Sequence, residues 1–302
     1  MNTDKKLVIV VLGPTASGKT DLGIALAKHF ELDVHNIDSR QIYIGMDIGT
    51  AKPPLSERKK IKHFLIDICQ PNKPITLHDF KKKANRSLEQ NLQQQPIGLL
   101  VGGSGLYLKA ITSGLEPPAV PPQKILREQL TRIGQVECHQ MLQNCDPKTA
   151  QKVAPADAIR TIRALEVFYA TGIPMSAQTN IKPPPWKILE IGLDPKNLHE
   201  RISARTENMY KNGLIEETQR LIDQFGTQLP LLKTIGYQEA LSIILEKMSL
   251  NEAIAITNHR TKNFAKRQRT WFKKQHSAEW INSENSFKES IGLIQHAIGC
   301  CK

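Results

Sequence analysis

The 302-residue chain has few cysteines, no long hydrophobic run and fewer acidic than basic residues, and each shortage excludes a class of protein. Its five cysteines form no C-x-x-C pair and are odd in number, which argues against a disulfide scaffold and against a cysteine-based zinc site. No apolar stretch is long enough to span a bilayer, and the segment MNTDKK before the first apolar run is too short for a signal peptide. We therefore expect a reduced cytoplasmic protein with no membrane association.

The charge balance points to an anionic partner. Lys and Arg number 41 against 29 Asp and Glu, and this excess favours a polyanion such as a nucleic acid. Hydrophobic residues at 40% and charged residues at 23% are ordinary values for a globular protein, so the chain has enough apolar residues to form a core.

Five short apolar runs predict a parallel sheet. They occupy residues 7–12, 33–38, 64–68, 97–101 and 187–193, and helical patterns separate them. This alternation predicts an α/β fold, a P-loop NTPase-like sheet core with helices on both faces. After residue 193 we expect helices to the end of the chain; the segment after about residue 282 has no readable role.

A break in the alternation of strand and helix patterns predicts a second domain. Residues 115–184 contain helical patterns and no strand candidate, with a proline-rich hinge, LEPPAVPPQ, at the start and PPPW at the end. We interpret this segment as a helical insertion domain in a core formed by residues 1–114 and 185–302.

The stretch GPTASGKT matches the phosphate-binding pattern G-x-x-x-x-G-K-[ST] between a predicted strand and a predicted helix. There, backbone N–H groups and a helix N-terminus form a positive cradle, Lys19 adds a charge, and the Thr20 hydroxyl can hold Mg²⁺. The pattern is typical of nucleotide-binding, ATP-binding proteins, but it does not say whether the chemistry is phosphoryl transfer. The predicted diphosphate- or nucleotide-binding residues are Gly13, Pro14, Thr15, Ala16, Ser17, Gly18, Lys19 and Thr20.

Two further loops follow predicted strands at the same rim of the sheet. The first, DSRQIYIGMDIGTAKP, begins with Asp38. That carboxylate can hold Mg²⁺ as in a nucleotide hydrolase, act as a general base toward a second substrate, or cap the next turn. The second loop, GGSGLY at 102–107, is a glycine turn that lets backbone approach a ligand closely.

Basic residues cluster on predicted helices. The segment 257–274, TNHRTKNFAKRQRTWFKK, mixes positive charge with aromatic residues, as in a contact with a phosphate backbone, although a solvated helix face is the alternative. At helical spacing one side carries charge and the other seats the helix on the core through Phe264, Trp271 and Phe272. Arg160 and Arg163 lie on adjacent turns of the insertion. Arg201 and Arg205 follow the last strand, where they can reach a pyrophosphate or remain surface charges.

Taken together, these motifs resemble the tRNA dimethylallyltransferase family, the bacterial tRNA isopentenyltransferases. The resemblance extends from about residue 8 to residue 274 and includes IRALEVFYATGIPMS, GLIEET, TIGYQEAL and AKRQRTWF. The chain departs from the usual family residues at Ser104, Phe64, Lys233 and Lys273; of these, Lys233 lacks the bidentate phosphate geometry of arginine.

The resemblance implies a specific reaction. The cradle then holds the diphosphate of dimethylallyl diphosphate, and the acceptor is N6 of adenosine 37 in tRNAs that read codons beginning with U. Asp38, Arg205 and Thr20 are the implied catalytic residues, with Mg²⁺ held by Thr20. The implied tRNA contacts, with the anticodon stem-loop, are Asp38, Ser39, Arg40, Gln41, Ser104, Arg127, Ile159, Arg160, Thr161, Ile162, Arg163, Lys233, Lys266 and Arg267. We expect a monomer.

Three alternatives use the same motifs. An adenylate isopentenyltransferase acting on AMP, ADP or ATP shares the P-loop and Asp38 but has less use for the insertion. A P-loop kinase uses Asp38 or Asp194 as its metal-holding acid. A tRNA-binding module without catalysis does not need Asp38 at all.

Overall fold

The computed structural model describes residues 6–178, 180–282 and 284–299. The chain divides into two compact units. Unit 1 comprises Met1–Ile75, Asp79–Thr112 and Pro184–Lys302; unit 2 comprises Thr76–His78 and Ser113–Pro183. We describe each unit separately.

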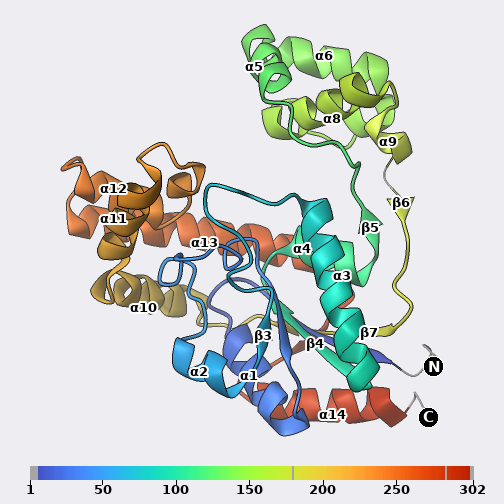
Figure 1. Cartoon of the computed structure of the whole chain (residues 1–302), viewed down its shortest axis with the longest axis vertical. Coiled ribbons are helices and arrows are strands. Elements are labelled where there is room, and N and C mark those ends of the chain that lie inside the picture. The colour runs from blue at the N-terminus through green and yellow to red at the C-terminus, as the bar shows by residue number, and fades with distance from the viewer. Residues whose placement is uncertain (1–5, 179, 283, 300–302) are drawn as a thin grey trace. The chain divides into compact units, whose positions relative to one another are not determined.

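Unit 1 is built on a parallel six-stranded sheet, which confirms the predicted α/β fold (Figure 1). The strand order is β3-β2-β4-β1-β7-β8. The strands are β1 (Leu7–Leu12), β2 (Val34–Ile37), β3 (His63–Phe64), β4 (Ile97–Gly102), β7 (Lys187–Leu193) and β8 (Glu279–Ile281). Strand β1 is central, pairs with β4 and β7, and is buried along its whole length. A central parallel strand contacts helices on both faces, which is why its sequence is apolar without alternation.

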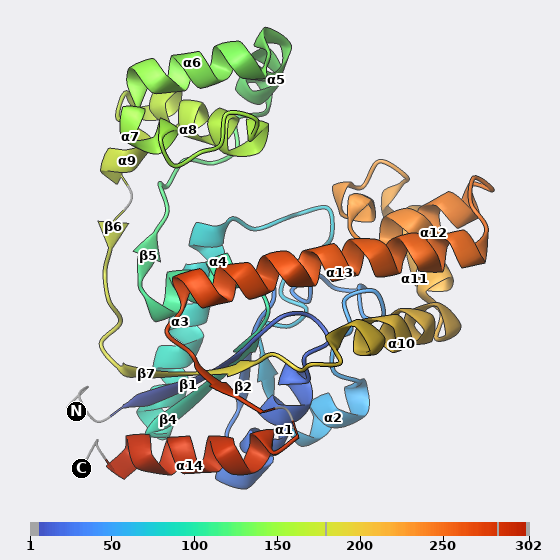
Figure 2. The same cartoon turned by 180° about the vertical axis from the view of Figure 1, so that it is seen from behind.

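Helices cover the two faces of this sheet (Figures 1 and 2). Alternate residues of β1 point to opposite sides. Val8, Val10 and Leu12 pack in one cluster with α3 (Leu77–Gln94), α4 (Gly105–Thr112) and α13 (Leu250–Gln275). Leu7, Ile9 and Val11 pack in another with α1 (Lys19–Phe30) and α14 (Ser286–Gly299). The remaining helices of unit 1 are α2 (Leu55–Lys60), α10 (Leu198–Lys211), α11 (Leu214–Phe225), η2 (Pro230–Lys233) and α12 (Tyr237–Ile244).

Two strand predictions were wrong. The run 64–68 is not a strand beyond Phe64, because Leu65 and Asp67 adopt left-handed backbone with φ of 65° and 55°. The chain after residue 193 is not helical throughout, because β8 pairs in parallel with β7 at the edge of the sheet. Both edge strands are two or three residues long, too short to produce a periodic pattern.

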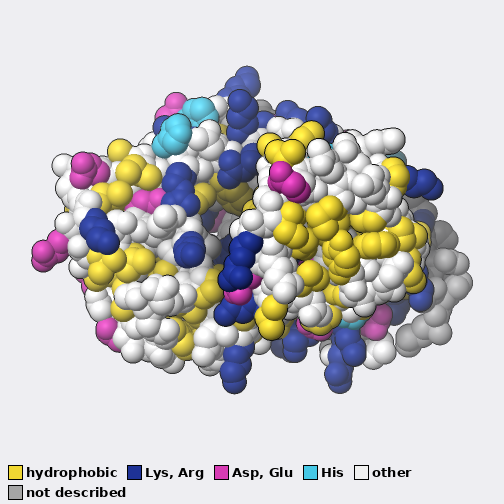
Figure 3. Space-filling view, turned by 90° about the horizontal axis from the view of Figure 1, so that it is seen from above, with side chains coloured by type: hydrophobic (Ala, Val, Ile, Leu, Met, Phe, Trp, Pro, Cys, Tyr) yellow, Lys and Arg dark blue, Asp and Glu magenta, His cyan; other side chains and the backbone are white. Residues whose placement is uncertain are grey.

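Unit 2 is mainly helical, with α5 (Lys124–Ile133), α6 (Gln135–Cys145), α7 (Pro147–Ala150), α8 (Ala158–Thr171) and α9 (Met175–Gln178). Its core contains Leu130, Leu142 and Leu165. The prediction of no strand was wrong in a small respect: β5 (Leu115–Glu116) and β6 (Asn180–Ile181) form a short antiparallel pair. Apolar side chains gather over the helices of this unit (Figure 3), and Ile125 and Val136 are among those exposed.

A buried carboxylate organises the start of unit 2. Glu166 is fully buried and accepts hydrogen bonds from the Arg127 guanidinium at 2.7 and 2.8 Å, from Arg163 at 2.6 Å and from the Gln123 N–H at 2.6 Å. Burial alone raises the pKa of Glu166, but these hydrogen bonds outweigh it and lower the pKa to about 2. Glu166 therefore remains ionised and ties α5 to α8.

Across the described part of the chain, no helix has the length and hydrophobicity needed to cross a membrane.

Candidate active site

The loop 13–20 joins β1 to α1 and needs glycine at two places. Gly13 and Gly18 have φ of 148° and 94°. A Cβ on Gly13 would lie 2.3 Å from the Leu193 carbonyl oxygen, so β7 leaves no room for a side chain. Arg201 of α10 steadies the loop, because its Nε donates to the Ala16 carbonyl at 2.8 Å. The loop amides and the N-terminus of α1 can form the predicted positive cradle.

Lys19, Arg205 and Asp38 form an interacting group of charges. The Nζ of Lys19 donates to the Pro14 carbonyl at 2.6 Å. The pKa of Lys19 is lowered to about 7 by burial and then by the Arg205 guanidinium, against the opposing effect of Asp38. Burial also lowers the pKa of Arg205, and Asp38 again opposes it. Two buried cations close enough for Arg205 to lower the pKa of Lys19 are suited to a multiply charged anion, which neutralises both.

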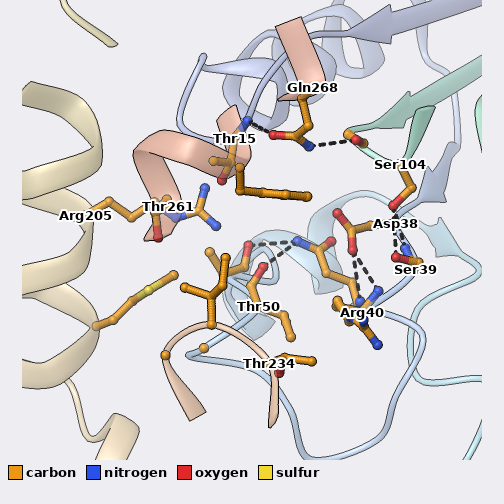
Figure 4. A pocket seen from close by; sticks show the side chains of 18 of the residues that line it. Thr15, Asp38, Ser39, Arg40, Thr50, Ser104, Arg205, Thr234, Thr261 and Gln268 are labelled. Atoms are coloured by element: carbon orange, nitrogen blue, oxygen red, sulfur yellow. Dashed lines mark hydrogen bonds between the residues drawn. The ribbon is translucent and has the colours of Figure 1, made fainter. Parts of the chain in front are cut away.

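Asp38 follows β2 and fills one of the roles considered from sequence, the cap of the next turn. Its Oδ1 accepts from the N–H groups of Arg40 at 2.8 Å and Gln41 at 3.3 Å, so the carboxylate does cap the next turn. It also lines the cavity, and it points into it opposite Arg205 (Figure 4). Capping occupies one carboxylate oxygen and fixes the orientation of the group, which leaves Oδ2 to act on a ligand.

The Ser39 and Ser104 side chains meet at the same rim. The Ser39 N–H donates to the Ser104 Oγ at 2.8 Å, and the two hydroxyls lie 3.2 Å apart. These hydrogen bonds join the loop after β2 to the glycine turn after β4. The sequence predicted that both loops lie at the same rim of the sheet, but not that they bind one another.

A buried carboxylate that the sequence reasoning missed shapes the next part of the loop. Glu217 of α11 accepts from the N–H groups of residues 47–49 at 2.8 to 3.1 Å, and the Tyr237 hydroxyl donates to it at 2.6 Å. The loop then presents the carbonyls of Thr50 and Ala51 to the Gln41 side-chain amide at 2.9 and 3.1 Å. Glu217 belongs to the motif GLIEET and Tyr237 to TIGYQEAL, but nothing in those motifs indicated that Glu217 binds the loop 47–49.

Helix α13 closes one side of the cavity. Phe272 is fully buried and Trp271 packs on the core, as predicted. Phe264 does not seat the helix: it is 39% exposed and lines the cavity. Lys266 and Arg267 are exposed on the same helix.

Asp194 is engaged elsewhere. It accepts from the Arg269 guanidinium at 2.8 Å and lies 3.4 Å from the Lys273 Nζ. It does not line the cavity, so the arrangement is wrong for the metal-holding acid of a kinase at the P-loop.

The cavity of about 420 Å³ lies within unit 1 and brings many of the predicted residues together. Those that line it are Thr15, Lys19, Thr20, Asp38, Ser39, Arg40, Gln41, Ser104, Arg205 and Lys233. Gly13, Pro14, Ala16, Ser17 and Gly18 shape the loop without lining the cavity, and Lys266 and Arg267 lie on α13 outside it.

The other predicted residues lie in unit 2. Ile159 is 84% exposed and Arg160 is exposed, so both side chains are at the surface of α8. Thr161 differs from the expectation: it is buried and accepts from the Gln135 side chain at 3.1 Å, so it holds α8 against α6. Ile162 packs against the core of the unit. Arg127 and Arg163 bind Glu166, as described above.

Thr20 is the predicted magnesium ligand. No group of three or more His, Cys, Asp or Glu able to hold a metal occurs among the described residues. The Thr20 hydroxyl lines the cavity beside the cradle. Mg²⁺ commonly keeps several waters and binds through substrate phosphates with one or two protein ligands, and Thr20 fits that mode.

The family model and the curated relatives that match this chain agree with one another. The IPP transferase family model matches residues 41–275. The tRNA dimethylallyltransferases of Prochlorococcus marinus (strain MIT 9211) and Synechococcus sp. (strain CC9311) are 57% and 53% identical to this chain, across 99% and 97% of it and 100% and 94% of their own lengths.

Solved structures agree with the sequence relatives. The full-length tRNA isopentenylpyrophosphate transferase of Bacillus halodurans matches with a TM-score of 0.72 at 31% identity, over 98% of each chain. A eukaryotic dimethylallyltransferase described as acting on tRNA matches with a TM-score of 0.78 at 26% identity, over 92% of this chain and 74% of its own.

Proposed function

The chain belongs to the IPP transferase family, and from this premise we propose that it transfers the dimethylallyl group of dimethylallyl diphosphate to N6 of adenosine 37 in tRNAs that read codons beginning with U. The products are the N6-dimethylallyl adenosine and diphosphate. Relatives of 52 to 57% identity over nearly the whole chain support dimethylallyl transfer to tRNA. The observation that carries the proposal is that Lys19, Arg205 and Asp38 meet in one cavity.

The leaving group is diphosphate, and its developing negative charge must be stabilised as the allylic C–O bond breaks. Lys19, the loop amides and Arg205 supply positive charge at that place. A Mg²⁺ ion held by Thr20 and the diphosphate would further neutralise it. Ile202, Met209, Ile235 and Phe264 give the cavity apolar surface for the five-carbon chain.

The acceptor is a poor nucleophile, because the N6 lone pair is delocalised into the adenine ring. As N6 forms its bond to the allylic carbon, its proton has to leave, and Asp38 is the base that receives it. Ser39 and Gln41 hold the adenine edge beside Asp38. The adenine reaches them by leaving the anticodon-loop stack.

The exposed cations define the proposed RNA contacts with the anticodon stem-loop. The exposed cations are Lys233, Lys266 and Arg267 in unit 1 and Arg160 in unit 2. The exposed Ile159 and the part-exposed Arg127 complete the proposed contacts, while Thr161, Ile162 and Arg163 act by holding α8 in place. We further propose that the enzyme works as a monomer in the cytoplasm.

The test uses labelled dimethylallyl diphosphate with an anticodon stem-loop that carries adenosine 37, and with AMP. We expect label on the stem-loop and little on AMP; equal rates on AMP favour the adenylate alternative. Phosphate release from ATP without any prenyl donor would favour a kinase.

Asp38→Asn separates catalysis from binding. We expect stem-loop affinity to stay near that of the wild type and transfer to fall about 10²–10⁴-fold, the usual effect of removing a general base. An unchanged rate would mean that Asp38 is not the base, and a parallel loss of affinity would reduce Asp38 to its capping role.

A further inference from the structure

The side-chain amide of Gln268 bridges the two glycine turns at the rim of the sheet (Figure 4). Its Oε1 accepts from the Thr15 N–H of the cradle at 2.8 Å. Its Nε2 donates to the Gly103 carbonyl, in the turn after β4, at 2.7 Å. Gln268 also lines the cavity together with Lys19 and Asp38.

This bridge needs both halves of an amide. One end must accept from an N–H and the other must donate to a carbonyl, and among side chains of this length Gln offers both groups without charge. Gly103 allows the close approach: a Cβ there would lie 3.1 Å from the Gln268 Nε2 and 3.6 Å from the Lys19 Nζ.

The helix that carries Gln268 is fixed immediately after it. Arg269, the next residue, binds Asp194 at the end of β7. Phe272, one turn further, is buried in the core. Lys266 and Arg267, the two preceding residues, are exposed. A side chain on such a rigid support holds its partners at a defined spacing.

We propose that Gln268 is a positioning residue for the transfer reaction. It holds Thr15 of the cradle and Gly103 of the facing turn at the spacing that sets the diphosphate opposite Asp38. This inference rests on the proposed function and assigns within it a residue that acts through the cradle.

Two substitutions separate the parts of the bridge. Gln268→Glu keeps the size and the acceptor for Thr15 but removes the donor to Gly103 and places a negative charge beside the diphosphate. Gln268→Met keeps the length and removes both hydrogen bonds. Gln224→Glu, at an exposed position of α11, is the matched control for the change in charge.

The measurements are the Kd for inorganic diphosphate with Mg²⁺, the KM values for dimethylallyl diphosphate and the stem-loop, and the melting temperature. For Gln268→Glu we expect the diphosphate Kd and the donor KM to rise about tenfold or more, as for loss of a hydrogen bond near a charged group. Gln268→Met should show a smaller rise in the same two quantities. The stem-loop KM and the melting temperature should stay near those of the wild type and of Gln224→Glu.

The pH dependence adds a readout that a purely structural role would not produce. A carboxyl beside a bound diphosphate has a raised pKa, and once protonated it can again donate to the Gly103 carbonyl. The ratio of donor KM values, Gln268→Glu over wild type, should therefore fall as the pH is lowered from about 8 to about 5.5.

Two results would overturn the proposal. Wild-type diphosphate affinity in both variants means that the bridge does not shape the cradle. If the diphosphate Kd and the stem-loop KM rise equally and the melting temperature falls, Gln268 supports the fold. If the wild type binds diphosphate but transfers nothing to RNA, the proposed function fails, while the diphosphate titration still decides the role of Gln268.

Discussion

The lowered pKa of Lys19 predicts that diphosphate binding takes up a proton. In the ligand-free site this pKa is about 7, because of burial and the neighbouring Arg205. A bound diphosphate raises it, since a nearby negative charge favours the charged amine. The pKa of the complex is therefore higher than that of the free protein. It follows that affinity is fully present below about pH 7 and is lost as the pH rises toward the pKa of the complex.

The magnitude follows from that pKa. At pH 8 about nine-tenths of the Lys19 side chains in the free protein are neutral, so binding takes up about 0.9 proton; at pH 6 the uptake is about 0.1. Between about pH 7.5 and 9 the Kd should rise by nearly tenfold per pH unit.

Calorimetry in buffers of different ionisation enthalpy measures this uptake directly, with inorganic diphosphate as ligand. Lys19→Arg is the matched control, because its guanidinium stays charged throughout this range. Diphosphate itself titrates near neutrality, and the control carries the same contribution, so the difference between the two proteins isolates Lys19. Equal proton uptake by wild type and Lys19→Arg at pH 8 would refute the reasoning.

Three further outcomes are expected. Lys266→Ala with Arg267→Ala should weaken stem-loop binding and reduce the slope of log Kd against log salt by about 1 to 2, whereas an unchanged slope places the RNA elsewhere. Tyr237→Phe removes the hydroxyl that donates to Glu217 and should raise the stem-loop KM at least severalfold, about 1–2 kcal/mol, with the diphosphate Kd unchanged. Glu166→Gln should lower the free energy of unfolding by about 1–3 kcal/mol at neutral pH, less than for a fully buried pair because Arg127 is partly exposed. The difference in the free energy of unfolding between the wild type and Glu166→Gln should decrease as the pH falls from about 4.5 to about 2. Denaturation at several pH values measures it.

The sequence predicted the four inner strands β2, β4, β1 and β7, each of which is at least four residues long. Strand β1 contacts core on both faces, so every residue is apolar and the run is easy to recognise. The edge strands β3 and β8 are short and partly exposed, and nothing in their composition requires extended backbone. The run 64–68 is apolar for another reason: Leu65 and Ile68 pack on the core from irregular backbone.

The site likewise contains residues that the sequence predicted and residues that it could not predict. The loop 13–20 is a local pattern, and the rule that ligands bind beyond the carboxyl ends of parallel strands brings Asp38 and Ser104 to it. Gln268 and Glu217 could not be found by either route. Gln268 lies 253 residues from its partner Thr15, and Glu217 lies at least 168 residues from the amides that it binds. Such contacts depend on how α11 and α13 pack, which a single sequence does not specify.

The excess of basic residues shows why composition alone overstates an RNA-binding surface. Several of the cations in the predicted interface are bound to carboxylates of the protein itself, and these contribute less to the release of counterions from RNA than free cations do. Lys266 and Arg267, by contrast, form no ion pair with any residue that the structure describes, and both are exposed. The salt dependence of binding should therefore follow these two residues more closely than the net charge. The internally paired cations, whose partners are Asp157, Glu166, Glu239 and Asp194, are Arg127, Arg160, Arg163, Arg260, Arg269 and Lys273.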